Sequence, residues 1–298
     1  MKIYILPINN CLQPNSQAFR YPAHNLDYGI EQDFLKYLLK KPELTTTNPE
    51  KADWHYLPVY WTRWHLNHDF AQTGLDKLYQ FVNQVILDDS KTFTVCQYDG
   101  GAQIELGKSI SFLAGPTEES NYYAPLLCTP HRTPIFKLSK KYLACFNGAF
   151  NTHLIRKEML NRLQTRTDLI IGGHVGTPFM RRFFLGKRFV TNMIESYVAL
   201  CPRGTSANSF RFFEAMQLGV VPCLISDIDV RPFHKYIDWD EVSFFVKTID
   251  ELESLLNSLD HKNVLQMGRK AHQCWKENIQ YQQWCKHLIH ELGDIINK

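Results

Sequence analysis

Long apolar runs are missing from this sequence of 298 residues. No stretch reaches the roughly 18 consecutive apolar residues of a membrane-spanning helix, so none is expected. The start also lacks the pattern of a signal peptide, because the apolar run Ile3–Leu6 stops at Pro7. We therefore expect a cytoplasmic protein in its natural short form, with Ile3–Leu6 as a first buried strand.

Paired cysteines are missing as well. The eight cysteines are scattered without a Cys-x-x-Cys pair, and Cys96, Cys145 and Cys223 lie inside apolar runs, so we expect reduced thiols. Near the end of the chain, residue types that bind zinc fall on different sides of a predicted helix: His272, Cys274, Cys285, His287 and His290. The sequence therefore predicts no metal site.

Excess charge of one sign is small. The net charge is +3, which gives no sign of the concentrated basic face of nucleic-acid-binding proteins. Hydrophobic residues make up 44% and charged residues 21%, which argues against a disordered chain. Aromatic residues reach 13%, and such residues line sugar sites as well as cores.

What the sequence does contain is an alternation of short apolar runs with segments of helical period, which predicts parallel strands in doubly wound α/β sheets. The first half contains strands at Ile3–Leu6, Ala52–Val59, Thr92–Cys96 and Ile110–Leu113, with helices at Tyr28–Leu39 and Leu75–Leu87. The second half contains strands at Lys141–Phe146, Asp168–Ile171, Tyr197–Cys201, Val220–Ile225 and Val242–Val246, with helices at Thr152–Leu163, Ser209–Leu218, Asp250–Leu259 and Lys262–Ile289. No Gly/Ser linker separates the halves, and we place the boundary near residue 138.

The segment Tyr197–Asp227 carries the densest chemical signal. Its loop lies where a strand ends and a helix begins, the position at which open α/β sheets bind ligands. Asn208 is the expected N-cap, and the start of the helix favours an anion such as a diphosphate. Arg203 and Arg211 add forked donors suited to phosphate, and Glu214 could accept hydrogen bonds from a ribose diol. The simpler interpretation is an ordinary strand, loop and helix with surface charges.

This same segment, CPRGTSANSFRFFEAMQLGVVPCLISD, resembles the exostosin-like (GT47-type) glycosyltransferases. Four further segments resemble that family in the same order along the chain. They are Tyr28–Glu31, Thr47–Tyr60, Lys141–Gly148 followed by Ile155-Arg156, and Arg231–Trp239. The resemblance therefore touches both halves of the chain.

The resemblance implies a GT-B fold: two Rossmann-like doubly wound domains that face a cleft, with a C-terminal helix crossing back to the first domain. The acceptor domain would be residues 1–137, the nucleotide-sugar donor domain 138–275, and the closing helix 276–298. The implied activity is inverting, metal-independent transfer of a sugar, without a cofactor. The donor would be a nucleotide-sugar, usually a UDP-sugar, and the acceptor an oligosaccharide or lipid-linked saccharide in surface polysaccharide or glycan synthesis.

The resemblance also implies site residues. The donor would be bound by Arg156, Arg203, Gly204, Asn208, Ser209, Arg211 and Glu214. Retaining enzymes of this fold often have a second glutamate eight positions before the ribose-binding one. That position here is Ser206, which agrees with inversion.

An inverting transfer needs a base for the acceptor hydroxyl. We favour Asp99, with His65 as the alternative and His24 and His131 as further candidates, although an aspartate before two glycines is also a common turn residue. Trp61 and Trp64 follow a strand and are expected either to stack on an acceptor sugar or to fill the core.

Two points stay open. The segment Phe179–Phe189 mixes basic and aromatic residues, and it would either form a solvated loop or hold the chain at the inner membrane face or a lipid-linked acceptor. The main functional alternative is a non-catalytic GT-B partner subunit that binds glycan or another transferase. Another nucleotide-sugar enzyme, such as an epimerase, is disfavoured because no G-x-G-x-x-G follows the first strand.

Overall fold

The computed structural model describes the chain except for residues 21, 23, 133–137, 173–187 and 298. It divides into two compact units: unit 1 is Met1–Thr129 together with Gln280–Lys298, and unit 2 is Pro130–Ile279. These bounds differ by several residues from those expected from the sequence. One reason is that the main chain of His131 hydrogen-bonds in both directions with the side chain of Gln217, deep in unit 2.

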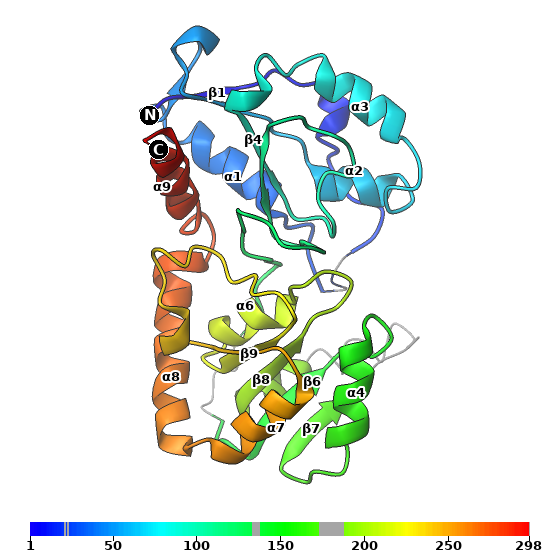
Figure 1. The fold of residues 1–298 in the computed structure, drawn as a ribbon, viewed down its shortest axis with the longest axis vertical. Coiled ribbons are helices and arrows are strands. Elements are labelled where there is room, and N and C mark those ends of the chain that lie inside the picture. Colours follow the sequence, from blue (N-terminus) through cyan, green and yellow to red (C-terminus); the bar gives the residue numbers. More distant parts are fainter. Residues whose placement is uncertain (21, 23, 133–137, 173–187, 298) are drawn as a thin grey trace. The chain divides into compact units, whose positions relative to one another are not determined.

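Unit 1 is built on a five-stranded parallel sheet in the order β2-β1-β3-β4-β5 (Figure 1). Short 3₁₀ helices at Asn10–Leu12, Pro49–Lys51 and Asp89–Lys91 join its elements. The strands are β1 (Ile3–Ile5), β2 (Thr45–Thr46), β3 (Trp54–Tyr56), β4 (Thr92–Cys96) and β5 (Ile110–Leu113), and the helices are α1 (Ile30–Leu39), α2 (Trp61–Asn67), α3 (Leu75–Asn83) and α9 (Cys285–Ile296).

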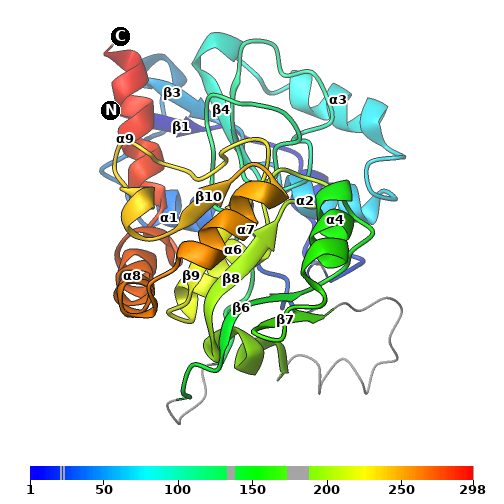
Figure 2. The ribbon, with the colours of Figure 1, turned by 60° about the horizontal axis from the view of Figure 1, so that its bottom comes forward.

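Unit 2 has a second five-stranded parallel sheet in the order β10-β9-β8-β6-β7. Helices α4 and α7 pack against each other, as do α6 and α8 (Figure 2). The strands are β6 (Tyr142–Asn147), β7 (Leu169–Gly172), β8 (Ser196–Pro202), β9 (Val221–Ile225) and β10 (Phe244–Val246); the helices are α4 (Leu154–Leu163), α6 (Phe210–Gln217), α7 (Ile249–Ser258), α8 (His261–Cys274), a π-helix at Trp275–Ile279 and a 3₁₀ helix at Trp239–Glu241.

The two sheets have the same topology. Counted from the first strand of each unit, both orders read 2-1-3-4-5, which is a doubly wound arrangement with its switch point between the first and third strands. Strands β4 and β9 are buried at every residue, as expected for parallel strands covered on both faces. The expected α/β class with two doubly wound units is therefore confirmed.

The C-terminal helix returns to the first unit, as expected of a GT-B chain. Trp54 of β3 donates its indole N–H to the carbonyl of Leu292 in α9 at 3.2 Å. The single long helix expected over Lys262–Ile289 is wrong, however, because α8 and the π-helix end at Ile279 and α9 starts only at Cys285. The break is stabilised by Asp33, whose carboxylate accepts the Gln282 main-chain N–H at 3.0 Å.

All eight cysteines are free thiols, and all but Cys11 are buried. Among the residues that the structure describes, no helix has the length and apolarity needed to cross a bilayer.

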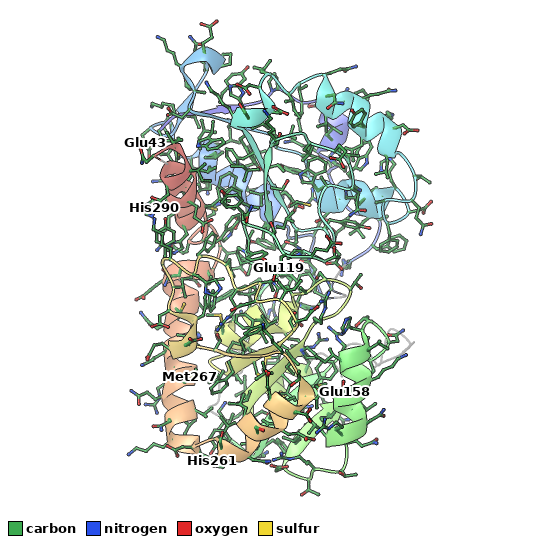
Figure 3. The ribbon with its side chains drawn as sticks, in the orientation of Figure 1. Glu43, Glu119, Glu158, His261, Met267 and His290 are labelled. Atoms are coloured by element: carbon green, nitrogen blue, oxygen red, sulfur yellow. The ribbon has the colours of Figure 1, made fainter. Side chains whose placement is uncertain are left out.

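Helix α8 packs unusually close to the strand connection before β9, and Gly268 makes this approach feasible. A Cβ atom on Gly268 would lie 2.7 Å from the carbonyl oxygen of Gly219. The neighbouring Met267 packs on the core of unit 2 (Figure 3). A side chain at position 268 would therefore push α8 away from the sheet.

We expect Gly268→Ala to lower the free energy of unfolding by about 1–3 kcal/mol, the usual cost of overpacking. The matched control is Gly293→Ala in α9, where nothing lies within 4 Å of the added Cβ. That change should stabilise the chain by roughly 0.5–1 kcal/mol, because alanine is the better helix former. Urea unfolding of both variants measures the difference, and equal stability would contradict the close approach of α8.

Candidate functional site

The switch point of unit 2 lies between β6 and β8, and both strands end there in residues singled out by the sequence. Strand β6 ends at Asn147 and is followed by Gly148, while Arg203 and Gly204 follow directly after β8. Ligands of doubly wound sheets bind outside the carboxyl ends of the strands at this point. The segment Tyr197–Asp227 therefore lies at the position where the sheet topology predicts a ligand site.

Arg203 is the central cation of this edge. It is only 7% exposed, its main-chain N–H donates to the carbonyl of Ile225 at 2.9 Å, and its Nη1 pairs with the Asp227 carboxylate. Its Nε–H is buried and has no hydrogen-bond partner in the part of the chain that the structure describes. A buried donor left without a partner costs about 1–3 kcal/mol, so such groups mark strain or a missing ligand.

The positive charge of Arg203 contributes to the pKa shifts of two neighbouring side chains. Burial, together with the positive charge of Arg203, lowers the pKa of His153, the N-cap of α4. Burial raises the pKa of Asp227, but its hydrogen bond and ion pair with Arg203 outweigh that effect and lower the pKa overall. The edge is therefore a region of positive potential with one carboxylate at its mouth, and Asp227 was not identified from the sequence.

Arg211, the second residue of α6, reaches back to the end of β6. Its Nε donates to the carbonyl of Asn147 at 2.5 Å, and its guanidinium carbon lies 5.0 Å from the centre of the Phe146 ring. A Cβ atom on Gly148 would overlap the Arg211 guanidinium, so glycine is required for this arrangement. The one signal for it in the sequence is the Asn147-Gly148 pair at the end of the strand.

Arg156 supports the loop after β8. Its three guanidinium nitrogens donate to the carbonyls of Arg203, Pro202 and Ala149 at 2.8, 2.9 and 2.9 Å. A Cβ atom on Gly204 would come within 3.0 Å of Arg156 Nη2. In this geometry Arg156 stabilises the shape of the loop, and its expected contact with a donor stays a prediction.

Helix α6 starts one residue later than expected. Its N-cap is Ser209, and the prediction of Asn208 as the cap is wrong because the Asn208 side chain instead accepts the Ser209 N–H at 2.8 Å. The Ser209 side chain makes no capping hydrogen bond to the main chain of the helix, and its hydroxyl accepts from Arg211 Nη1 at 3.4 Å. The positive end of α6 is thus directed to the same edge of the sheet.

Glu214 and His131 form a buried pair. The His131 Nε2 and Glu214 Oε1 atoms are 2.8 Å apart, and the two side chains are 10% and 6% exposed. The candidate base His131 thus lies beside the residue expected to bind ribose. The sequence could not predict this pairing, because the two residues are 83 positions apart along the chain.

Trp61 and Trp64 belong to the core of unit 1. They lie in α2, which the sequence did not predict, and are 0% and 2% exposed within one apolar cluster. Trp61 donates its indole N–H to the Thr94 hydroxyl at 2.8 Å, and Trp64 stacks on His68 with ring centres 4.0 Å apart. Neither ring has an exposed face for a sugar, so of the two interpretations the structure favours core packing.

The remaining base candidates lie in unit 1. Asp99 is half-buried in the turn after β4, where the Gly100 N–H donates to the carbonyl of Gly115 at 2.8 Å. His65 is completely buried in α2, and burial lowers its pKa to about 4. His24 lies with its Nε2 3.4 Å from the Cys128 thiol. Asp99 is thus partly exposed and His24 is exposed, whereas His65 is closed to solvent.

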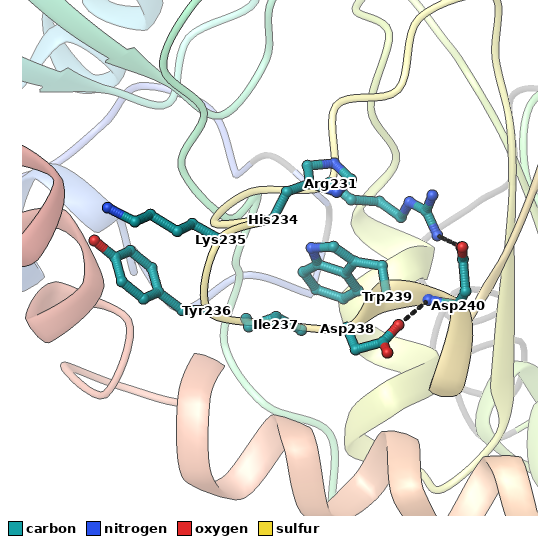
Figure 4. Close-up of a pocket in the computed structure, with 8 residues that line it drawn as sticks. All are labelled: Arg231, His234, Lys235, Tyr236, Ile237, Asp238, Trp239 and Asp240. Atoms are coloured by element: carbon teal, nitrogen blue, oxygen red, sulfur yellow. Dashed lines mark hydrogen bonds and ion pairs between the residues drawn. The ribbon is translucent and has the colours of Figure 1, made fainter.

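A cavity of about 470 Å³ opens in the segment after β9, lined by residues 231–240 (Figure 4). It contains none of the residues expected to bind the donor. The Arg231 guanidinium in its wall is already bonded to Asp229, Asp240 and Ser243. We assign no function to this cavity.

Most of the basic and aromatic segment Phe179–Phe189 lies outside the described residues.

Comparison with known proteins agrees with the sequence resemblance. Residues 128–259 match the family model of the Exostosin GT47 domain. Exostosin-1 of Drosophila melanogaster is 25% identical over 47% of this chain and 21% of its own length. The probable glucuronosyltransferase 47 A of Physcomitrium patens is 24% identical over 81% of this chain and 62% of its own length.

Among solved structures, AviGT4, a glycosyltransferase involved in avilamycin A biosynthesis, is 10% identical with a TM-score of 0.41, covering 100% of this chain and 98% of its own. The chain spans about a fifth of exostosin-1 and less than two thirds of the moss protein. The matched residues 128–259 include the whole strand-loop-helix edge described above. Residues 128–259 are therefore similar to the Exostosin GT47 domain, and all but the first two of them belong to the unit that carries the candidate site.

Proposed function

We propose that this chain is an inverting, metal-independent glycosyltransferase. Its donor would be a nucleotide-sugar carrying UDP, and its acceptor an oligosaccharide or lipid-linked saccharide in surface polysaccharide or glycan synthesis. The proposal is supported by relatives that are named as glucuronosyltransferases and as a β-1,4-xylosyltransferase.

The observation that carries the proposal is the buried Arg203 beside the start of α6. A guanidinium whose Nε–H has no partner among the described residues and the positive end of a helix share one strand end in unit 2. Both features favour a diphosphate, through charge-assisted hydrogen bonds and through the helix dipole. Arg211 and the Asn208-Ser209 turn would complete the phosphate contacts, and Glu214 would accept the ribose hydroxyls.

The chemistry would proceed in one displacement. The base, for which we favour Asp99, would take the proton of the acceptor hydroxyl while its oxygen bonds to the anomeric carbon. The bond from that carbon to the diphosphate oxygen would break on the opposite face, which inverts the configuration. Arg203 and the dipole of α6 would stabilise the charge that develops on the leaving UDP, the role that a metal ion has in other transferases.

A thermal-shift screen tests the donor assignment. The protein would be heated with UDP, GDP, CMP and their common sugars, with and without EDTA. A ligand at 100 times its Kd stabilises the folded state by about 2.7 kcal/mol, and we expect such a shift with UDP that EDTA leaves unchanged. The absence of a shift with any nucleotide would contradict a working donor site and favour the non-catalytic partner subunit.

A further inference from the structure

The pair of His131 and Glu214 is the feature of unit 2 that the expected donor contacts leave unexplained. We propose that His131 is a positioning residue, which holds the Glu214 carboxylate in the orientation that accepts the ribose hydroxyls of the donor. The inference rests on the proposed function, because it assumes that a ribose binds at Glu214. Its direct support is the 2.8 Å contact between His131 Nε2 and Glu214 Oε1.

The pair is held in place by the main chain as well as by its side chains. The Gln217 side-chain amide accepts the His131 N–H through Oε1 at 3.2 Å and donates to the His131 carbonyl through Nε2 at 3.1 Å. Glu214 and Gln217 are three residues apart on α6 and therefore lie on one face of the helix. One helix face thus fixes both the backbone and the ring of His131.

The ring itself has little freedom. The His131 side chain is 10% exposed, and its ring centre lies 5.2 Å from that of Phe189. An arrangement in which two separate elements restrain one imidazole is unlike a chance surface contact. It fixes the direction from which Glu214 receives its hydrogen bond.

The chemistry of the pair defines what remains for a ligand. An ionised carboxylate only accepts hydrogen bonds, so the His131 Nε2 must carry the proton that lies between the two residues. That bond uses one of roughly four acceptor positions of the carboxylate, so it leaves capacity for hydroxyl donors. Because the pair is largely shielded from water, the bond is stronger than at a surface and keeps the Glu214 side chain in one rotamer. Such preorganisation removes an entropic cost from ligand binding.

The test compares two ligands that differ only in the ribose hydroxyls, UDP and 2′,3′-dideoxy-UDP, by titration calorimetry. We expect His131→Ala to weaken UDP binding about tenfold or more, the scale of a lost hydrogen bond to a charged group. The affinity for dideoxy-UDP should stay close to that of the wild type. His131→Gln retains an N–H donor at this position and should restore most of the UDP affinity.

A purely structural role predicts a different pattern, since a distorted α6 would weaken both ligands by the same factor. Equal losses for UDP and dideoxy-UDP, or unchanged UDP binding in His131→Ala, would therefore overturn the inference. If His131→Ala does not fold, Gln217→Ala provides the same comparison, because it removes the two hydrogen bonds that hold the His131 main chain and so lets the imidazole move away from Glu214.

Two controls separate this inference from the proposed function. His261→Ala changes a histidine at the start of α8, which stacks on Tyr197 near the other end of β8, and both affinities should match the wild type (Figure 3). If the wild-type protein itself does not bind UDP, the proposed function fails and this inference falls with it. If the wild type binds UDP and only the selective loss is missing, the proposed function stands and this inference alone fails.

Discussion

Replacing Arg203 with alanine is expected to weaken UDP binding about 100-fold, equivalent to about 2.7 kcal/mol and within the range of a lost charged hydrogen bond. The residue combines a buried guanidinium, an Nε–H with no partner in the described part of the chain, and a place at the switch point of the sheet. The loss of stability should be smaller than the loss of binding. The Arg203 main-chain bond to Ile225 is kept, and the Asp227 side chain left behind is 65% exposed to water. Calorimetric titration with UDP, together with a melting curve, measures both effects.

The matched control is Arg166→Ala. Arg166 is also an arginine of unit 2 paired with an aspartate, Asp168, but this pair lies before β7, away from the carboxyl edge. Its removal should leave UDP affinity unchanged. Asp227→Asn should tighten UDP binding severalfold, because it removes the carboxylate that competes with phosphate for Arg203. Unchanged binding in Arg203→Ala would contradict a diphosphate site at this strand end.

Elements that are defined by local pattern could be predicted from the sequence. The bounds of β4 and β5 agree with the expected strands Thr92–Cys96 and Ile110–Leu113, since each is a short apolar run between polar turns. Helix α2 was missed because it is only seven residues long, less than the window in which a helical period can be recognised. Its tryptophans suggested a binding surface when in fact they fill the core of unit 1.

The break before α9 had no local signal. No glycine or proline lies between Ile279 and Cys285, and Gln282 adopts a positive φ of 61°. That conformation is compensated by its hydrogen bond to Asp33, 249 residues away. A contact of this kind depends on how the closing helix packs within unit 1. The hydrophobic periodicity of the sequence does not predict such packing.

The same distinction between local patterns and long-range contacts applies to the candidate site. Arg203, Arg211 and Glu214 could be found because one motif places them on one loop and helix. Their pairings could not, because Asp227 lies 24 residues from Arg203 along the chain and His131 lies 83 residues from Glu214. The sequence therefore identified the groups that would meet a donor, and only the fold revealed which groups orient them.

A second large effect is expected at Asp99, the favoured base. Asp99→Asn should reduce turnover about 100-fold or more, the usual contribution of a general base, with the Kd for UDP unchanged because the proposed donor site lies in the other unit. The carboxylate approaches Gly115 closely, since a Cβ atom there would lie 2.7 Å from Asp99 Oδ1. Gly115→Ala should therefore displace Asp99 and also slow turnover. Initial rates with the donor identified in the shift screen, and calorimetry with UDP, provide the two readouts.

Mutation separates the two leading bases where a pH profile does not. Burial lowers the pKa of His65 to about 4, so a rate profile without a limb near 6.5 would not exclude it. The control Asp76→Asn makes the same chemical change at the exposed start of α3 and should leave turnover intact. Near-normal turnover in Asp99→Asn, combined with a large loss in His65→Gln, would move the base to α2. Because His65 has no exposed surface, that result would also require α2 to open before the acceptor can reach its imidazole.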